Sequence, residues 1–294
     1  NESIAIREAV ERYGVVFQHG TQQRSDWRFR FATELVRNEK RGKLEKIIIG
    51  SAGYPPVGPQ PIEPVPEGLD YDFWLGPAPK KPFNKNRFHF TFRWFWDYAG
   101  GMMTDWGVHI MDYALFGMQK YAPKSVMSLG GKFAYPDDAC ETPDTQQAIY
   151  EFDDFTVLWD HGIGIDGGYY GRSHGVGFVG NEGTLVVDRG GWEVIPEPKG
   201  GEPTLDRVDL IRGDGKGLHN HMVNFTEGIK NGAKLNCPVE IAAGVARTCH
   251  LGNVAYKTGR RLYWDASKSK FINDADADSY LYPEYRKPWE LPAI

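Results

Sequence analysis

The chain has 294 residues, 41% of them hydrophobic and 14% aromatic, which is enough for one large domain or two ordinary ones with a packed core. Its formal charge of -5 and its pI near 5.9 give no electrostatic reason to expect a nucleic-acid partner. No apolar run approaches the roughly 18 to 20 residues that span a bilayer, so we expect a soluble protein with no membrane partner. The three cysteines lack CxxC spacing and favour free thiols in the cytoplasm, with an upstream targeting segment left open.

The N-terminal third predicts two helices, two strands and a long loop. The apolar spacing from Ile4 to Tyr13 predicts a helix, Val15 to Phe17 predict a short buried strand, and residues 27–38 predict a second helix. Residues 44–52 then predict a strand. Six prolines between residues 55 and 66 exclude regular structure there.

The remainder of the chain predicts an antiparallel sheet followed by two helices. Strand-like runs alternate with turn residues from 124 to 195. Helices are expected over residues 221–229 and 238–257, the second ended by Gly259. The last thirty residues are rich in Asp, Tyr and Pro, which predicts an extended tail lying on the body.

Two segments match the pattern G-x-G-x-x-G, at residues 162–167 and 175–180. A dinucleotide site needs this pattern between a strand and a helix, with an acidic residue about twenty positions later. The sequence predicts no helix after either segment. We therefore do not expect either one to bind a nucleotide.

Asp105 and His109 stand four residues apart in a segment that predicts a loop entering a helix. This spacing brings their Cβ atoms to roughly 5–6 Å on one helical face. A nearby carboxylate raises the pKa of histidine above its usual value of about 6.5, so the pair suits a general base with its orienter. The same spacing also occurs in solvated surface pairs and in buried histidines that a carboxylate satisfies.

An aromatic segment precedes this pair, with seven aromatic residues among the twelve from Arg87 to Tyr98. Indole and phenyl faces bury large apolar areas, and they also suit the C–H faces of sugar rings. The segment therefore favours a carbohydrate ligand near Asp105 and His109.

Several motifs in order resemble those of the glucose-fructose oxidoreductase and inositol dehydrogenase family of NAD(P)-dependent sugar oxidoreductases. The motifs are residues 13–18 with 22–25, Phe73–Pro79, Gly100–Asp112, Cys249–Tyr256 with Gly259 and Arg260, and Tyr285–Trp289. Members of that family have an N-terminal Rossmann domain, which carries the dinucleotide fingerprint and a catalytic lysine. A C-terminal α/β domain with a large open sheet follows it.

The resemblance implies an α/β fold: a large, open, mainly antiparallel sheet with helices on one face, preceded by the remnant of a Rossmann βα unit. It implies a remnant of the dinucleotide-binding domain at residues 1–40 and a substrate-binding and oligomerisation domain at 41–294. Asn1 aligns just after the family's lysine motif. We therefore expect NAD or NADP to belong to an intact family member and not to be bound by this chain alone.

The resemblance also places Asp105 and His109 on the family's catalytic positions, with His109 as the base and Asp105 as its orienter or a ligand of the hydroxyl. Arg93, Trp96 and Asp97 are candidates for contact with the substrate.

Other residues complete the candidate site. His161 and His174 stand at predicted strand ends and are expected to line the cleft. Gln22 and Arg24 follow the predicted strand that ends at Gln18, where α/β sheets bind ligands, and are candidates for contact with nicotinamide or substrate. We expect no metal site, with a site formed by His219, His221, His109 and a carboxylate kept as an alternative.

The leading hypothesis is an oxidoreductase that acts on a secondary hydroxyl of a small carbohydrate, a sugar or polyol, and associates into a homo-oligomer through its open sheet face. A cofactor-free carbohydrate-binding or scaffold module is one alternative. A lyase, epimerase or glycosidase that uses the same cleft with a transient redox step or a metal is another.

Overall fold

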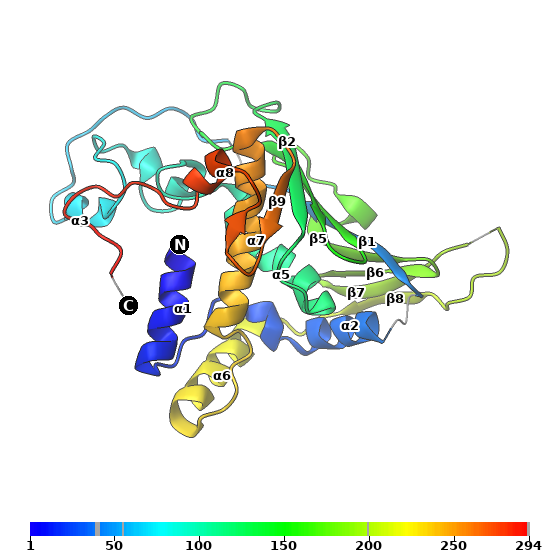
Figure 1. Cartoon of the computed structure of the whole chain (residues 1–294). Helices are drawn as coiled ribbons and strands as arrows, with labels where there is room; N and C mark the ends of the chain where they lie inside the picture. Colours follow the sequence, from blue (N-terminus) through cyan, green and yellow to red (C-terminus); the bar gives the residue numbers. More distant parts are fainter. Residues whose placement is uncertain (39–41, 55, 199, 293–294) are drawn as a thin grey trace.

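A ten-stranded open sheet dominates the computed structural model, which describes residues 1–38, 42–54, 56–198 and 200–292 (Figure 1). The strand order is β10-β9-β2-β3-β4-β1-β5-β6-β7-β8. The strands are β1 (Leu44–Ser51), β2 (Ser125–Gly131), β3 (Thr145–Glu151), β4 (Thr156–Gly162), β5 (His174–Gly180), β6 (Gly183–Asp188), β7 (Gly191–Pro196), β8 (Val208–Arg212), β9 (Leu262–Asp265) and β10 (Lys270–Phe271).

The strand β1 lies in the middle of the sheet although it comes first in the chain. It runs parallel to β4 and antiparallel to β5, and every other neighbouring pair is antiparallel. Side chains alternate between the two faces of a strand. Ile47 and Ile49 are fully buried, and Ile47 pairs with the equally buried Val157 of β4 and Phe178 of β5. These side chains define the inner face of the sheet.

Helices cover this inner face and leave the other face open. The helices α2, α5 and α7 pack against the sheet, and α1 packs on α7 (Figure 1). The helices are α1 (Glu2–Tyr13), α2 (Trp27–Arg37), α3 (Tyr71–Leu75), α4 (Met102–Asp105), α5 (Gly107–Met118), α6 (Gly217–Asn231), α7 (Val239–Thr258) and α8 (Ala275–Ser279), with 3-10 turns η1 (Gln22–Ser25), η2 (Lys85–Arg87), η3 (Thr91–Trp94) and η4 (Tyr169–Gly171). Within the described ranges, no helix is long and apolar enough to cross a membrane.

The predicted fold class is confirmed, with one element missing. The open, mainly antiparallel sheet with helices on one face is present, and the first two helices form as expected. The strand predicted at Val15–Phe17 is wrong, because this stretch has no strand partner, and Val15 and Val16 are 55% and 42% exposed. The chain there runs beside residues that precede α7, where the His19 N–H donates to the carbonyl of Cys237 at 3.0 Å.

A long arm between β1 and α4 carries α3 and the aromatic segment, and the C-terminal tail holds it. Arg286 donates to the carbonyls of Ala78 and Gly76 at 3.1 and 2.9 Å, and its guanidinium lies 3.0 Å from the carboxylate of Asp72. These contacts satisfy backbone carbonyls at the end of α3, which a short helix cannot satisfy by itself. The C-terminal tail therefore lies on the arm, and the last thirty residues include β10 and α8 where the sequence predicted an extended chain.

A buried ion pair ties η1 to α5. Arg24 Nε lies 2.9 Å from both carboxylate oxygens of Asp112, and its Nη2 lies 2.7 Å from Oδ1. The same guanidinium donates to the hydroxyl of Tyr121 at 3.2 Å and lies 4.4 Å from the ring centroid of Phe116. The two charged side chains are 2% and 0% exposed. A charge pair this far from water is stable only while both partners are present.

Asp112→Asn should therefore destabilise the fold strongly. Removing one charge leaves the Arg24 guanidinium buried without its counter-ion, and we expect the free energy of unfolding to fall by about 3–5 kcal/mol. Urea denaturation followed by circular dichroism measures the change. Asp154→Asn, in the exposed pair with Lys120, is the matched control and should cost no more than about 1 kcal/mol. Equal losses in the two variants would contradict the prediction.

Candidate active site

The start of α5 lies at one end of the strands in the middle of the sheet. At this end β1, β4 and β6 finish, and β5 and β7 begin. Trp106, between α4 and α5, marks this meeting point. Its Nε1–H donates to the hydroxyl of Tyr54 at 3.0 Å, just after β1. Its ring packs edge-on against His174 at the start of β5, with the ring centroids 4.9 Å apart. Half-buried side chains thus converge from three segments that are far apart in sequence.

Asp105 and His109 both lie at this place, but each has different neighbours from those expected. The helix is interrupted at Trp106, and the His109 N–H donates to the carbonyl of Trp106 at 3.0 Å. The carboxylate of Asp105 forms an ion pair with Arg93, with Nε and Oδ1 3.2 Å apart. His109 Nδ1 is buried and has no hydrogen-bond partner among the described residues. Asp105 therefore does not orient His109 through a hydrogen bond.

The protonation of His109 is also opposite to the expectation. Its pKa is lowered to about 4, first by burial and then by the positive charge of Arg189 and the nearby His19. The predicted rise from a neighbouring carboxylate is wrong, because Asp105 is engaged by Arg93 and desolvation outweighs it. The lowered pKa keeps His109 uncharged at neutral pH, with its Nδ1 buried and without a hydrogen-bond partner among the described residues. Burial raises the pKa of Asp105, and Arg93 partly opposes this shift.

Aromatic rings wall this place. Tyr54 packs against Phe90, Trp94 and Trp106, with ring centroids 4.9, 5.5 and 6.3 Å apart. The guanidinium of Arg93 lies 3.9 Å from the ring centroid of Phe90. Part of the aromatic segment thus lies next to Asp105, because Phe90 and Asp105 both contact Arg93.

Trp96 and Asp97, predicted to contact the substrate, are occupied by contacts of their own. The Trp96 Nε1–H donates to the carbonyl of Glu141 at 3.0 Å, and the ammonium of Lys257 in α7 lies 4.0 Å from its ring centroid. Asp97 forms an ion pair with Lys81. These contacts fasten the arm to α7 and to the loop before β3, and the structure does not bring either residue against His109.

His161, predicted to line the cleft, is instead in the core. It is 1% exposed, and both ring nitrogens are used. Nδ1 accepts from the Nε1–H of Trp159 at 2.9 Å, and Nε2 lies 3.3 Å from the carbonyl of Pro143. It points inward because His161 follows the alternation of β4, which also buries Val157 and Trp159.

Arg24 and Gln22, predicted to contact nicotinamide or substrate, lie in η1. The guanidinium of Arg24 forms its ion pair with Asp112 and is buried. Gln22 is half-buried beside the start of α6. Gly213, Gly215 and Gly217 lie between β8 and the start of α6, but Leu218 stands where the full G-x-G-x-x-G pattern would have its last glycine.

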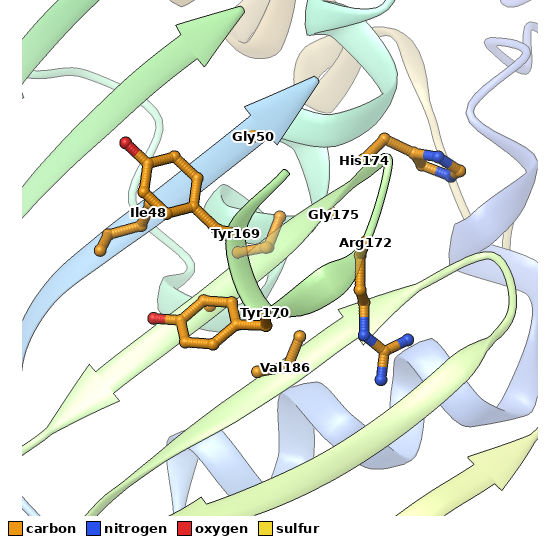
Figure 2. Close-up of a pocket in the computed structure, with 10 residues that line it drawn as sticks. Ile48, Gly50, Tyr169, Tyr170, Arg172, His174, Gly175 and Val186 are labelled. Atoms are coloured by element: carbon orange, nitrogen blue, oxygen red, sulfur yellow. The ribbon is translucent and has the colours of Figure 1, made fainter. Parts of the chain in front are cut away.

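Neither glycine pattern stands at the start of a helix, and one glycine of the second pattern, Gly177, has a packing explanation. The first ends β4 and continues into a turn, and the second is the strand β5 itself, so neither opens a helix. On the open face of the sheet, Tyr169 and Tyr170 of η4 lie across β1 and β5 (Figure 2). A Cβ added at Gly177 would lie 2.6 Å from the Tyr170 ring, and one at Gly50 would lie 3.0 Å from Tyr169. The glycines leave room for the tyrosines, which border a small pocket with Ile48.

The alternative metal site is not formed. Both ring nitrogens of His221 are occupied, by the Ser25 hydroxyl at 2.6 Å and the His19 carbonyl at 2.7 Å, and His219 is exposed. The residues that the structure describes contain no group of three or more His, Cys, Asp or Glu side chains that could hold a metal ion.

The sequence did not predict three residues near Trp106 and His109: Tyr54, His19 and Arg189. Tyr54 stands in the proline-rich loop, and Arg189 in the turn between β6 and β7. Loop residues after strands are common functional positions, but nothing in the local sequence ties these residues to His109. Only the sheet order brings the ends of β1 and β6 beside α5.

Residues 57–163 match the sequence model of a family described as the oxidoreductase family, C-terminal alpha/beta domain. This segment runs from the arm through β4 and contains Asp105 and His109. Residues 57–163 are therefore similar to the C-terminal domain of that family, and the resemblance indicated by the sequence is confirmed. No curated protein sequence matches the chain.

Solved structures share the fold. A putative myo-inositol dehydrogenase from Sinorhizobium meliloti is 14% identical with a TM-score of 0.58, covering 89% of this chain and 69% of its own. The aldose-aldose oxidoreductase from Caulobacter crescentus complexed with glycerol is 15% identical at 0.59, covering 87% and 66%. The WlbA dehydrogenase from Bordetella pertussis, in complex with NADH and UDP-GlcNAcA, is 12% identical at 0.59, covering 90% and 67%. This chain thus spans about two thirds of their length, and at these identities the similarity concerns the fold.

The buried His161 makes stability depend on pH. Its pKa is lowered to about 4, mainly by burial, so the folded protein keeps it neutral while the unfolded chain takes up a proton near pH 6.5. Its stabilising contribution is therefore present above about pH 6.5 and is lost as the pH falls toward 4. Between pH 7 and pH 5 we expect a loss of about 2 kcal/mol from this group.

Urea denaturation at pH 7 and pH 5 tests this expectation in the wild type and in His161→Gln. The variant should lose less stability between the two pH values than the wild type does, whatever its stability at pH 7. His219→Gln, at an exposed histidine, is the control and should keep the wild-type difference. The same difference in all three proteins would rule out His161 as the source.

Proposed function

We propose that this chain provides the substrate-binding part and the proton acceptor of a nicotinamide-dependent oxidoreductase that acts on a secondary hydroxyl of a sugar or polyol. The observation that supports this most directly is the state of His109. Its side chain is neutral, and its Nδ1 is free at a place walled by aromatic rings.

Oxidation of an alcohol removes a hydroxyl proton as well as a hydride, so it needs a base near the hydroxyl group. A neutral imidazole with a free nitrogen can act as that base, whereas an imidazolium cannot. Asp105 forms an ion pair with Arg93 through Oδ1. Its carboxylate can still accept a hydrogen bond from the same hydroxyl or from a neighbouring one. The nicotinamide would supply the hydride acceptor.

The comparisons support this proposal at the level of class. The matching family model is that of an oxidoreductase domain. Among the structures of the same fold, one was solved with glycerol and another with NADH and a nucleotide sugar. The aromatic wall formed by Tyr54, Phe90 and Trp106 suits the C–H face of a sugar ring.

His109→Gln should abolish most turnover. The protein expressed from its complete reading frame is incubated with NAD+ or NADP+ and a panel of sugars and polyols, and nicotinamide reduction is followed by absorbance. Because a positioned base contributes about 10²–10⁴-fold, we expect kcat to fall at least roughly 10²-fold in the variant. His219→Gln, in the exposed part of α6, should retain wild-type kcat.

The alternatives give different results in this assay. Conversion of the sugar without net nicotinamide reduction would favour a lyase, epimerase or glycosidase with a transient redox step. Sugar binding without any conversion would favour a carbohydrate-binding module. Turnover that survives in His109→Gln would remove His109 from the mechanism.

We also propose that the chain forms a homo-oligomer through the open face of the sheet. Met127, Leu129 and Ile149 on this face are 42%, 64% and 46% exposed, and Met127 pairs with Ile149 across β2 and β3. Adjacent exposed apolar side chains on a flat surface favour association. A symmetric pair of copies could cover the face of each with the other.

Ile149→Asp should dissociate this oligomer, because a carboxylate buried in an apolar contact would lose its hydration. Size-exclusion chromatography with light scattering should show a multiple of the 33.2 kDa chain for the wild type and a smaller species for the variant. Ile62→Asp, at a 69% exposed isoleucine in the arm, is the control and should leave the mass unchanged. A monomeric wild type would refute the proposal.

The cytoplasm is the compartment that we propose for this protein. Cys140, Cys237 and Cys249 are all free, and Cys237 and Cys249 are buried. Free thiols persist in a reducing compartment.

A further inference from the structure

Arg189 projects from the turn between β6 and β7 toward the place occupied by Trp106 and His109. Its guanidinium carbon lies 4.8 Å from the ring centroid of Trp106, and its side chain is exposed. It also lies near the hydroxyl of Tyr113 and within electrostatic range of His109. Stacking on an indole holds the guanidinium in place while its N–H groups stay free to bind.

Arg189 forms no ion pair with a carboxylate of the described residues. The adjacent Asp188 forms an ion pair with Arg172, with Oδ2 and Nη1 2.8 Å apart. Its Oδ1 accepts hydrogen bonds from the backbone N–H groups of Gly190 and Gly191 at 2.7 and 3.0 Å. Across the part of the chain that the structure describes, no carboxylate lies within ion-pair distance of Arg189. The other arginine here, Arg93, has its own partner in Asp105. Arg189 therefore has no direct ion-pair partner among the described residues, although Arg172 is paired with both Asp188 and Glu193.

Two residues that contact Trp106, His109 and His174, carry unpartnered polar atoms. His109 Nδ1 and His174 Nε2 are buried and have no hydrogen-bond partner among the described residues. Burial without a partner is costly for a polar atom, unless a ligand or water completes it. A guanidinium without an ion-pair partner and two imidazole nitrogens without hydrogen-bond partners together suit a ligand that carries an anionic group and several hydroxyls.

We propose that Arg189 binds the anionic group of an acidic sugar, a carboxylate or a phosphate, and so selects the substrate of this site. The proposal rests on the proposed function for the reaction but concerns binding alone. The sugar ring would lie against Trp106, which places a hydroxyl of the ring within reach of His109. Both anionic groups accept two parallel N–H groups from a guanidinium, which gives direction as well as affinity.

The test is equilibrium binding by isothermal titration, without nucleotide, of three probes: glucuronate, glucose 6-phosphate and glucose. The wild type should bind at least one anionic probe about tenfold more tightly than glucose, since charge-assisted hydrogen bonds are roughly twice as strong as neutral ones. Added salt should weaken this preference. The anion that binds more tightly identifies the group as carboxylate or phosphate.

Arg189→Met should remove the preference and leave glucose binding unchanged. Arg189→Lys keeps the charge without the planar fork, so it should retain part of the preference. Arg207→Met is the control, at a 58% exposed arginine directly before β8. It changes the net charge by the same amount as Arg189→Met and should bind the probes as the wild type does. Equal binding of the three probes, no binding of either anion, or an unchanged preference in Arg189→Met would each overturn the proposal.

Failure of this proposal differs from failure of the proposed function. If the anionic probes bind through Arg189 but no sugar is oxidised, the proposed anion site is supported and the proposed oxidoreductase function is refuted. If neutral sugars are oxidised through His109, and Arg189→Met leaves their kcat/KM and the probe affinities unchanged, the proposed oxidoreductase function is supported. The proposed anion site is then refuted.

Discussion

The buried ion pair between Arg24 and Asp112 is the interaction on which the position of α5 depends. It joins the turn η1 to the middle of α5 with no access to water, so neither residue can leave without stranding the other charge. The start of α5 then carries Trp106 and His109 to the sheet edge where β1 and β6 end. A residue that looked like a ligand contact in the sequence thus supports the candidate site through the fold.

Desolvation decides the chemistry at that edge. A carboxylate and an imidazole four residues apart suggest a proton pair, yet Asp105 is engaged by Arg93 and His109 stands beside Arg189. Burial and a nearby positive charge both disfavour the imidazolium, so they act in the same direction on the pKa. His109 is neutral for this reason and not because of Asp105. The proposed base therefore gains its state from residues in distant parts of the chain.

The two faces of the sheet serve different purposes. The inner face carries the fully buried row of Ile47, Val157 and Phe178 under the helices. The open face carries glycines where Tyr169 and Tyr170 lie on it, and exposed apolar side chains farther along, on β2 and β3. Gly177, within the pattern that resembles a nucleotide fingerprint, thus leaves room for the ring of Tyr170 on β5.

The sequence by itself determined the elements whose pattern is local: the helices before residue 38, the alternating strands from 124 to 195, and the family of the domain. Periodicity and turn residues act over a few positions, so one chain segment suffices to reveal them. The tertiary structure decided which side chains meet. It placed His161 in the core, left Val15 and Val16 without a strand partner, and brought Arg189 beside His109. Burial and charge at these positions come from neighbours far away in sequence, and no local pattern records them.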